Sequence, residues 1–101
     1  MAHQAHLDLL TGLPNPALFI ETLDQALSRA QRHDQKFGLL YIDIDGFKAV
    51  NDSFGHQAGD MLLVEIAQRL RAVLRAEDTV ARLGGDEFAV VVDHANEPDA
   101  L

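Results

Sequence analysis

Residues 79–92 read TVARLGGDEFAVVV, and this stretch decides the fold. Two runs rich in β-branched and apolar residues, 79–83 and 88–92, flank four residues, GGDE, that are typical of a tight turn. The pattern predicts a β-hairpin in which a glycine supplies positive φ, because glycine reaches that conformation without a steric penalty. The tip of this hairpin carries two acids, Asp86 and Glu87.

A further strand is predicted upstream, over residues 38–44. Its centre, LLYI at 39–42, is apolar on both faces, which is typical of a strand buried in the middle of a sheet. The run ends in Asp43 and Asp45, and their spacing of two predicts that both side chains project on the same side.

These acids form the first candidate site. If the hairpin pairs beside the upstream strand, Asp86 and Glu87 reach the same edge of the sheet as Asp43 and Asp45. Carboxylates at close range are costly unless a cation lies among them, and magnesium prefers one or two carboxylates together with substrate phosphates. The alternative is that they are turn and strand-end acids that keep the chain soluble. For Asp45 or Asp86 alone the two interpretations weigh equally, whereas the coincidence of two pairs favours the metal.

Helical periodicity predicts two long helices and one short one. Asn15 is expected to cap the first helix, residues 16–32, with Pro16 at its first position. A short helical turn is expected after Gly46, and the second long helix after Gly55. The order helix, strand, helix, strand, strand indicates a mixed α/β domain. The apolar stripes of the long helices are Ile20, Leu23, Leu27 and Ala30, and Leu63, Ile66, Ala67, Leu70 and Leu74.

Polar residues around the short helix form a second candidate site. Gly46, Phe47 and Lys48 open that helix, and exposed backbone N–H groups beside a lysine can cradle phosphate. The alternative is that Phe47 fills the core and Lys48 is solvated. Asn51 and Asp60 offer an amide and a carboxylate that match the edge of guanine, although a favourable interaction with the helix dipole equally explains Asp60.

Two further positions have ordinary explanations when the residues are taken alone. His56 is favoured as a capping or packing histidine. Arg75 near a helix C-terminus is typical of a side chain that satisfies carbonyls, with Asp78 in the following turn.

Composition limits the class of protein. With 101 residues the chain is one small domain, and the absence of cysteine excludes disulfides and fits a reducing cytoplasm. The charge of -8 predicts that nucleic acid and anionic membranes are repelled, so a polyphosphate ligand needs a cation. No apolar run reaches the length of a membrane span, so we expect a soluble, cytoplasmic domain whose parent protein can still carry a membrane anchor elsewhere.

Five segments together resemble the GGDEF family of diguanylate cyclases in order and spacing. The resemblance implies an α/β (α+β) fold with a ferredoxin-like core, as in nucleotidyl cyclases and polymerase palm domains: an antiparallel central sheet flanked by helices. We assign one partial GGDEF domain to residues 1–101, with a lead-in over 1–12, a core over 13–93, and a loop or the start of a missing C-terminal part over 94–101. The segments are LTGLPN at 10–15, DIDGFK at 43–48, NDSFGH at 51–56, GD at 59–60 and RLGGDEF at 82–88.

The resemblance also implies a role for each candidate residue. Magnesium, with manganese as the alternative, is expected at Asp43, the carbonyl of Ile44, Asp86 and Glu87, and the last two are also the catalytic acids. Substrate binding is assigned to Asn51, Asp60, Gly46, Phe47, Lys48, His56, Gly84 and Gly85. Arg75 and Asp78 match the family's product-inhibition site.

The implied reaction joins two GTP molecules into cyclic dimeric GMP, a bacterial second messenger, and releases two pyrophosphates. Each domain holds one GTP, so activity requires a homodimer in which two domains face each other. The alternative is a catalytically silent module that senses GTP or cyclic dimeric GMP, for example beside a phosphodiesterase domain. The intact GGDEF stretch favours the enzyme. We expect the isolated 101-residue chain to be weakly active or inactive, because part of the sheet and some of the basic residues that bind the phosphates are missing.

Overall fold

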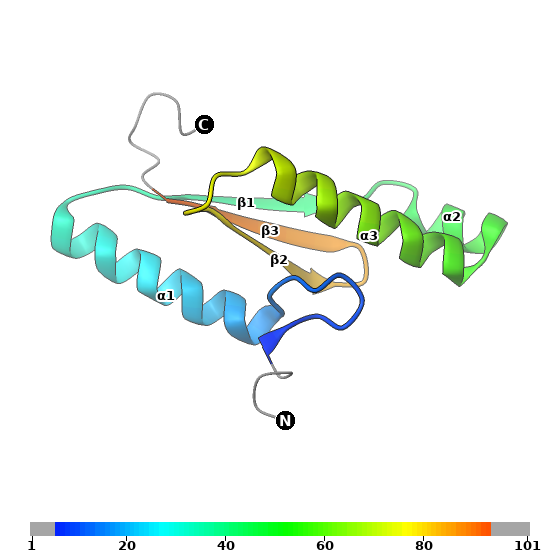
Figure 1. The fold of residues 1–101 in the computed structure, drawn as a ribbon, viewed down its shortest axis with the longest axis horizontal. Helices are drawn as coiled ribbons and strands as arrows, with labels where there is room; N and C mark the ends of the chain where they lie inside the picture. The colour runs from blue at the N-terminus through cyan, green and yellow to red at the C-terminus, as the bar shows by residue number, and fades with distance from the viewer. Residues whose placement is uncertain (1–5, 94–101) are drawn as a thin grey trace.

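The structure, a computed structural model, describes residues 6–93 and contains three helices and three strands in that range. The helices are α1 (Pro16–His33), α2 (Phe47–Phe54) and α3 (His56–Val73), and the strands are β1 (Gly38–Asp43), β2 (Thr79–Gly84) and β3 (Glu87–Val92) (Figure 1). The predicted element order and the mixed α/β class are confirmed. Residues 94–101, predicted as a loop or the start of a missing part, lie outside the described residues, as do residues 1–5.

The three strands form one antiparallel sheet in the order β1-β3-β2. The predicted hairpin is β2–β3, and it also pairs beside β1, with Asp43 opposite Glu87. The pairing of β2 with β3 is irregular between Arg82 and Gly84. The prediction of a glycine at positive φ in the hairpin turn is wrong, because neither Gly84 nor Gly85 has positive φ.

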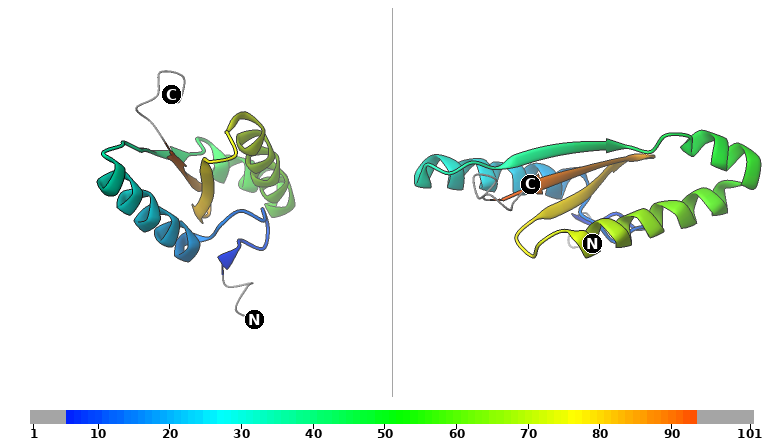
Figure 2. Two further views of the ribbon diagram at one scale, coloured as in Figure 1. Left: turned by 60° about the vertical axis from the view of Figure 1, so that its left-hand side comes forward. Right: turned by 90° about the horizontal axis from the view of Figure 1, so that it is seen from above.

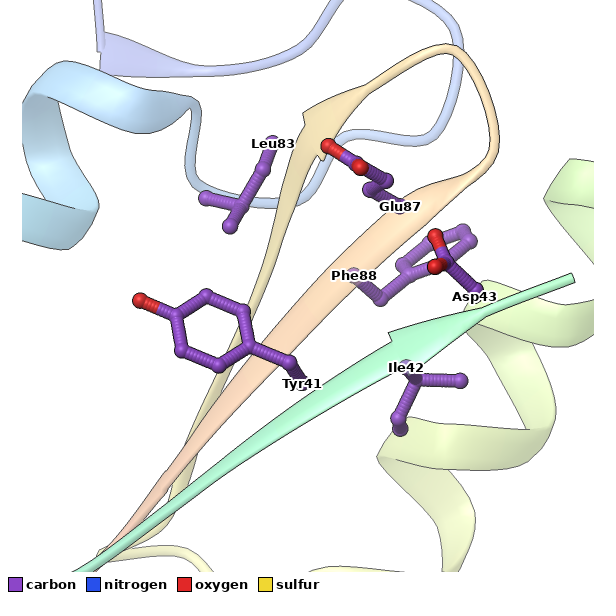
Figure 3. A pocket seen from close by; sticks show the side chains of 6 residues that line it. All are labelled: Tyr41, Ile42, Asp43, Leu83, Glu87 and Phe88. Atoms are coloured by element: carbon purple, nitrogen blue, oxygen red, sulfur yellow. The ribbon is translucent and has the colours of Figure 1, made fainter.

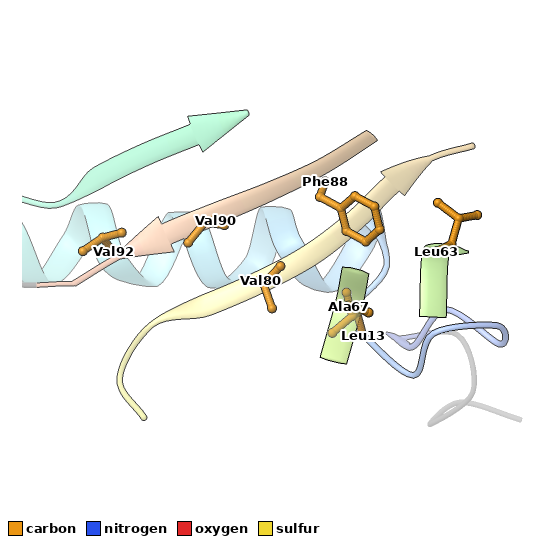
Figure 4. Close-up of a cluster of buried hydrophobic side chains, with 7 residues drawn as sticks. All are labelled: Leu13, Leu63, Ala67, Val80, Phe88, Val90 and Val92. Carbon is orange, nitrogen blue, oxygen red and sulfur yellow. The ribbon is translucent and has the colours of Figure 1, made fainter. Parts of the chain in front are cut away.

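Alternating residues of the sheet feed two separate cores on its two faces, since successive side chains of a strand point in opposite directions. Val80, Phe88 and Val90 pack with Leu63 of α3 on one face (Figure 4). Ala81 and Ala89, among others, pack on the other face against α1. The result is three layers, with the sheet between α1 and α3 (Figure 2).

The start of α1 follows the sequence prediction. Asn15 is the N-cap, its side-chain oxygen accepts a hydrogen bond from the backbone N–H of Leu18 at 3.0 Å, and Pro16 is the first helical residue. The face that α1 buries differs in part from the predicted stripe, however. Phe19 and Ala26 are buried and Leu23 of the predicted stripe packs against the same cluster, whereas Ile20 and Leu27 are exposed. The small residues Ala26, Ala81 and Ala89 share one core cluster, and this allows α1 to approach the sheet closely.

For α3 the predicted stripe is confirmed. Leu63 and Ala67 are buried, and Ile66, Leu70 and Leu74 pack against the same cluster. Among residues 6–93 no helix combines the length and the apolar character that a membrane crossing requires.

The prediction that the upstream strand is central and buried is wrong. Within the described residues β1 pairs only with β3 and forms one edge of the sheet. The side chains of Leu39, Leu40 and Tyr41 are 39%, 46% and 69% exposed. These residues are apolar, but whether they are buried depends on which elements pack over the strand. Here α1 packs over the β2 side of the sheet.

Candidate functional site

The first predicted site lies where β1 ends and β3 begins. Asp43 and Glu87 are directly paired residues of these strands, so their side chains project from the same face. They line a cleft of about 260 Å³ together with Tyr41, Leu83 and Phe88 (Figure 3). Both acids are exposed at its mouth, where a ligand from solvent can reach them.

Not all of the predicted acids gather there. Asp45 and Asp86 are not among the residues that line the cleft. In the part of the chain that the structure describes, His, Asp and Glu side chains nowhere form a group of three or more that could hold a metal ion by themselves. The backbone nevertheless draws the two segments together, because the N–H of Ile44 donates to the carbonyl of Asp86 at 3.1 Å.

This donor set fits a magnesium ion that is bound together with a phosphate ligand. Asp43 and Glu87 are like charges in directly opposite strand positions, an arrangement that is unfavourable without a cation. Among residues 6–93 the carbonyl of Ile44 accepts a backbone hydrogen bond only from the N–H of Phe47, at a long 3.4 Å, and a carbonyl oxygen has a second lone pair to offer. Oxygen ligands of this kind, few in number and completed by water and phosphate, are what Mg²⁺ prefers.

Arg82, to which the sequence analysis assigned no role, holds the hairpin turn. The guanidinium of Arg82 donates from Nε to the carbonyl of Gly84 at 3.1 Å and from Nη2 to the carbonyl of Gly85 at 3.0 Å. Its Nη1 lies 3.1 and 3.2 Å from the two carboxylate oxygens of Asp8. Asp8 in turn accepts from the backbone N–H and the hydroxyl of Thr11, both at 2.8 Å. Arg82 therefore ties the turn that carries Asp86 and Glu87 to the segment before α1.

The charge state of Asp8 reflects these contacts. Burial by itself raises the pKa of this carboxyl, but hydrogen bonds from Thr11 and the nearby Arg82 guanidinium outweigh burial and hold the pKa below its ordinary value. The Asp8–Arg82 pair is thus ionised throughout the neutral range. The spacing Asp8-x-x-Thr11, a common turn pattern, is the one sequence signal that could have pointed to it.

The backbone conformation of the hairpin turn does not require glycine at position 84 or 85, since neither residue has positive φ. A Cβ on Gly85 would meet nothing within 4 Å, and one on Gly84 would lie 3.4 Å from Glu87 Oε1. The open space beside Gly85 leaves room for a ligand to contact the backbone of the turn.

The phosphate-cradle residues begin α2. Gly46 is the N-cap at φ 77°, no side chain caps the helix start, and Lys48 is exposed. Phe47 is partly buried and packs against the core cluster beneath α3, so the alternative reading of this residue as a core residue is confirmed.

The predicted guanine-reading pair lies where α2 meets α3. Gly59 is buried against Asn51, and a Cβ on Gly59 would come within 1.8 Å of Asn51 Oδ1. This contact brings Asn51 beside the residue that follows Gly59, the exposed Asp60. Oδ1 of Asn51 is buried and has no hydrogen-bond partner among the described residues, which is the state expected of a group that awaits a ligand.

His56 is exposed at the first position of α3, which argues against the packing interpretation of this residue, while its assignment to substrate binding stays a prediction. Asp60 lines a shallow groove of about 310 Å³ with Leu10, Met61 and Val64. An acid beside apolar side chains suits a flat, polar-edged ligand such as a nucleobase.

Arg75 and Asp78 lie at the opposite end of β3 from Glu87. Six residues of strand separate these ends, roughly 20 Å at 3.3–3.4 Å per residue. The carboxylate of Asp78, only 3% exposed, accepts from the backbone N–H of Arg75 at 3.0 Å and of Asp93 at 3.2 Å. Asp78 is therefore a turn acid, as its local sequence suggests, whereas the guanidinium of Arg75 remains partly exposed.

Comparison with known proteins agrees with this geometry. Residues 5–101 match the family described as diguanylate cyclase, GGDEF domain. The chain belongs to the GGDEF family. This GGDEF domain is 53% identical over 93 residues to the bifunctional diguanylate cyclase/cyclic di-GMP phosphodiesterase MucR of Pseudomonas aeruginosa, covering 92% of this chain and 14% of MucR. It is 55% identical to the diguanylate cyclase TpbB of the same organism, over 100% of this chain and 23% of TpbB.

Solved structures of GGDEF domains share the fold. The GGDEF domain of TpbB superposes with a TM-score of 0.82 at 55% identity, over 85% of this chain and 50% of that one. The GGDEF domain of DgcB from Caulobacter crescentus, solved in complex with c-di-GMP, superposes with a TM-score of 0.85 at 37% identity, over 89% of this chain and 51% of that one. This GGDEF domain thus spans less than a quarter of the length of MucR and of TpbB and about half of these solved chains.

Proposed function

We propose that this GGDEF domain catalyses the condensation of two GTP molecules into cyclic di-GMP, as the names of TpbB and MucR indicate for those relatives. The observation that carries the proposal is the direct pairing of Asp43 with Glu87 at the mouth of one cleft. Two carboxylates that face each other beside an open cleft suit the recruitment of a cation and a triphosphate. Both acids belong to segments in which this chain keeps the residues of the family's motifs.

In this proposal the guanine lies at the junction of α2 and α3. The buried, unpartnered oxygen of Asn51 accepts from the base, and the carboxylate of Asp60 accepts from two N–H groups of its edge. Adenine lacks that pair of donors, so Asp60 selects guanine. The triphosphate then runs past the start of α2, where free backbone N–H groups and Lys48 bind it, toward Asp43.

Magnesium is proposed at Asp43, the carbonyl of Ile44 and Glu87, with Asp86 close by through its backbone bond to Ile44. When bound, it neutralises phosphate charge and lowers the pKa of an attacking hydroxyl. The 3′-oxygen of one GTP forms a bond to the α-phosphorus of the other, and the bond from that phosphorus to pyrophosphate breaks. In this proposal Glu87 receives the hydroxyl proton. A second, equivalent transfer closes the ring and releases the second pyrophosphate.

Two domains are required, because one cleft of about 260 Å³ offers a single pair of facing acids. The proposed arrangement is a homodimer in which each domain presents one GTP to the other. Arg75, at the far end of β3, is proposed as the phosphate-binding member of a feedback site for cyclic di-GMP. The complex of c-di-GMP with the DgcB GGDEF domain supports binding of this ligand class by the fold.

The second candidate is a silent sensory module attached to a phosphodiesterase. It is favoured by 40% identity to NbdA of Pseudomonas aeruginosa, whose name states only cyclic di-GMP phosphodiesterase activity. The presence of both Asp43 and Glu87 favours the enzyme over this alternative.

The deciding experiment uses the intact protein that carries this domain, incubated with GTP and Mg²⁺ while pyrophosphate and cyclic di-GMP are measured. We expect product from the wild type, a loss on the order of 10² to 10⁴ in Glu87→Gln, and full activity in Glu21→Gln, an exposed control on α1. Guanine-nucleotide binding by a demonstrated dimer without any product would instead establish the sensory module.

A further inference from the structure

The residue that follows β3, Asp93, is held by two side chains of the turn before β2, Arg75 and Asp78, and by one side chain of α1, Arg29. Its backbone N–H donates to Asp78 Oδ1 at 3.2 Å, and its carbonyl accepts from Arg75 Nη2 at 3.0 Å. Its carboxylate accepts from Arg29 Nη2 of α1 at 2.6 Å. Two arginines thus converge on one aspartate.

We propose that the Asp93 carboxylate is an internal competitor that sets the affinity of the Arg75 site for cyclic di-GMP. This inference rests on the proposed feedback role of Arg75. It assigns a regulatory residue that lies outside the family motifs of this chain.

The chemistry of arginine supports competition. A guanidinium binds carboxylate and phosphodiester oxygens through the same planar fork of N–H donors, so the Asp93 carboxylate on Arg29 occupies a cation that a ligand phosphate at Arg75 could otherwise use. Arg29 and Arg75 both contact atoms of Asp93, and a phosphodiester that engages Arg75 therefore comes within a few ångströms of the Asp93 carboxylate. The Asp93 carboxylate repels the ligand, and it already pairs with Arg29, one of the two nearby cations.

Exposure supports an exchange of partners. The side chain of Arg29 is 41% exposed and that of Asp93 is 15% exposed, so solvent reaches the ion pair. Because its arginine is exposed, the pair contributes less to stability than a fully buried pair, and breaking it leaves the charge of Arg29 in contact with water. Asp78, by contrast, is buried and bonded to backbone on both oxygens, so it stays in place while the Asp93 carboxylate changes partner.

The two members of the ion pair predict opposite effects. Asp93→Asn keeps both backbone hydrogen bonds of residue 93 and removes only the negative charge. We expect it to tighten binding of cyclic di-GMP by about three- to tenfold, the size of one charge removed at about 6 Å in a partly solvated site. Arg29→Gln leaves the carboxylate without its cation, and we expect binding to weaken about threefold or more. A purely structural role of the pair would make both variants bind less well.

The measurement is calorimetric titration of the intact protein with cyclic di-GMP, with thermal unfolding recorded for each variant. Glu21→Gln is the matched control, because it removes one negative charge from an exposed position on α1 eight residues before Arg29; its affinity should match the wild type within about twofold. Unchanged or weaker binding by Asp93→Asn, while Arg75→Ala abolishes binding, overturns this inference alone. Absence of cyclic di-GMP binding by the wild type overturns the proposed feedback site and this inference with it.

Discussion

Arg82 offers the sharpest test of how this domain holds its hairpin. Arg82→Ala removes two hydrogen bonds to the carbonyls of Gly84 and Gly85 and the ion pair with Asp8. The side chains of Arg82 and Asp8 are only 18% and 21% exposed, so water replaces these contacts incompletely. A hydrogen bond to a charged group contributes about 1.5–3 kcal/mol, and the three interactions are not additive because they share one guanidinium. We expect a loss of about 3 kcal/mol in the free energy of unfolding.

Urea unfolding measures this loss directly. Arg69→Ala is the matched control, because Arg69 pairs with Glu65 on the surface of α3 and its side chain is 79% exposed. That substitution should cost about 0.5 kcal/mol or less. A double-mutant cycle of Arg82→Ala with Asp8→Ala should return a coupling energy of about 1 kcal/mol or more. Equal losses of unfolding free energy for Arg82→Ala and Arg69→Ala, or no coupling in the cycle, would refute the role assigned to Arg82.

The same substitution should loosen the turn locally. The N–H of Ile44 donates to the carbonyl of Asp86, inside the turn that Arg82 holds. We therefore expect faster amide hydrogen exchange at Ile44 in Arg82→Ala than in the wild type, beyond the change that the global loss of stability produces.

Three further outcomes follow from single contacts. Because the folded-state pKa of Asp8 is lowered, its stabilisation is complete above the ordinary carboxyl value of about 3.9 and disappears as the pH falls through the folded-state pKa; unfolding midpoints of wild type and Asp8→Asn should converge once the pH lies below that folded-state pKa. Gly59→Ala should displace the Asn51 amide and weaken binding of GTP about tenfold or more, measured by titration, while circular dichroism shows the helix retained, since alanine is the better helix former. Asn15→Ala should lower the unfolding free energy by about 1 kcal/mol in urea titrations, because the N–H of Leu18 loses its cap.

Local patterns in the sequence were sufficient for the secondary structure. The cap at Asn15, the stripe of α3 and the β2–β3 hairpin each depend on residues close together in the chain, and all three are confirmed. The acids of the first site were found in the same way, because they end one strand and begin another.

Other features depended on which elements become neighbours. An apolar run such as residues 39–42 is compatible with a central strand or an edge strand, and only the pairing of β1 with β3 alone decides that it is an edge within the described residues. The buried face of α1 was likewise set by the small residues Ala81 and Ala89 on the sheet opposite. No local periodicity contains that information.

Side-chain interactions across long sequence separations were the least predictable. Asp8 and Arg82 are 74 positions apart, and Arg29 and Asp93 are 64 apart, so neither pair leaves a periodic signal. The identity of the GGDEF residues was readable from the sequence alone, because it resides in short motifs of fixed spacing. Tertiary structure alone decided that Asp43 faces Glu87, that Gly59 admits Asn51, and that Asp93 lies between two arginines, because these contacts exist only after the sheet and helices have packed.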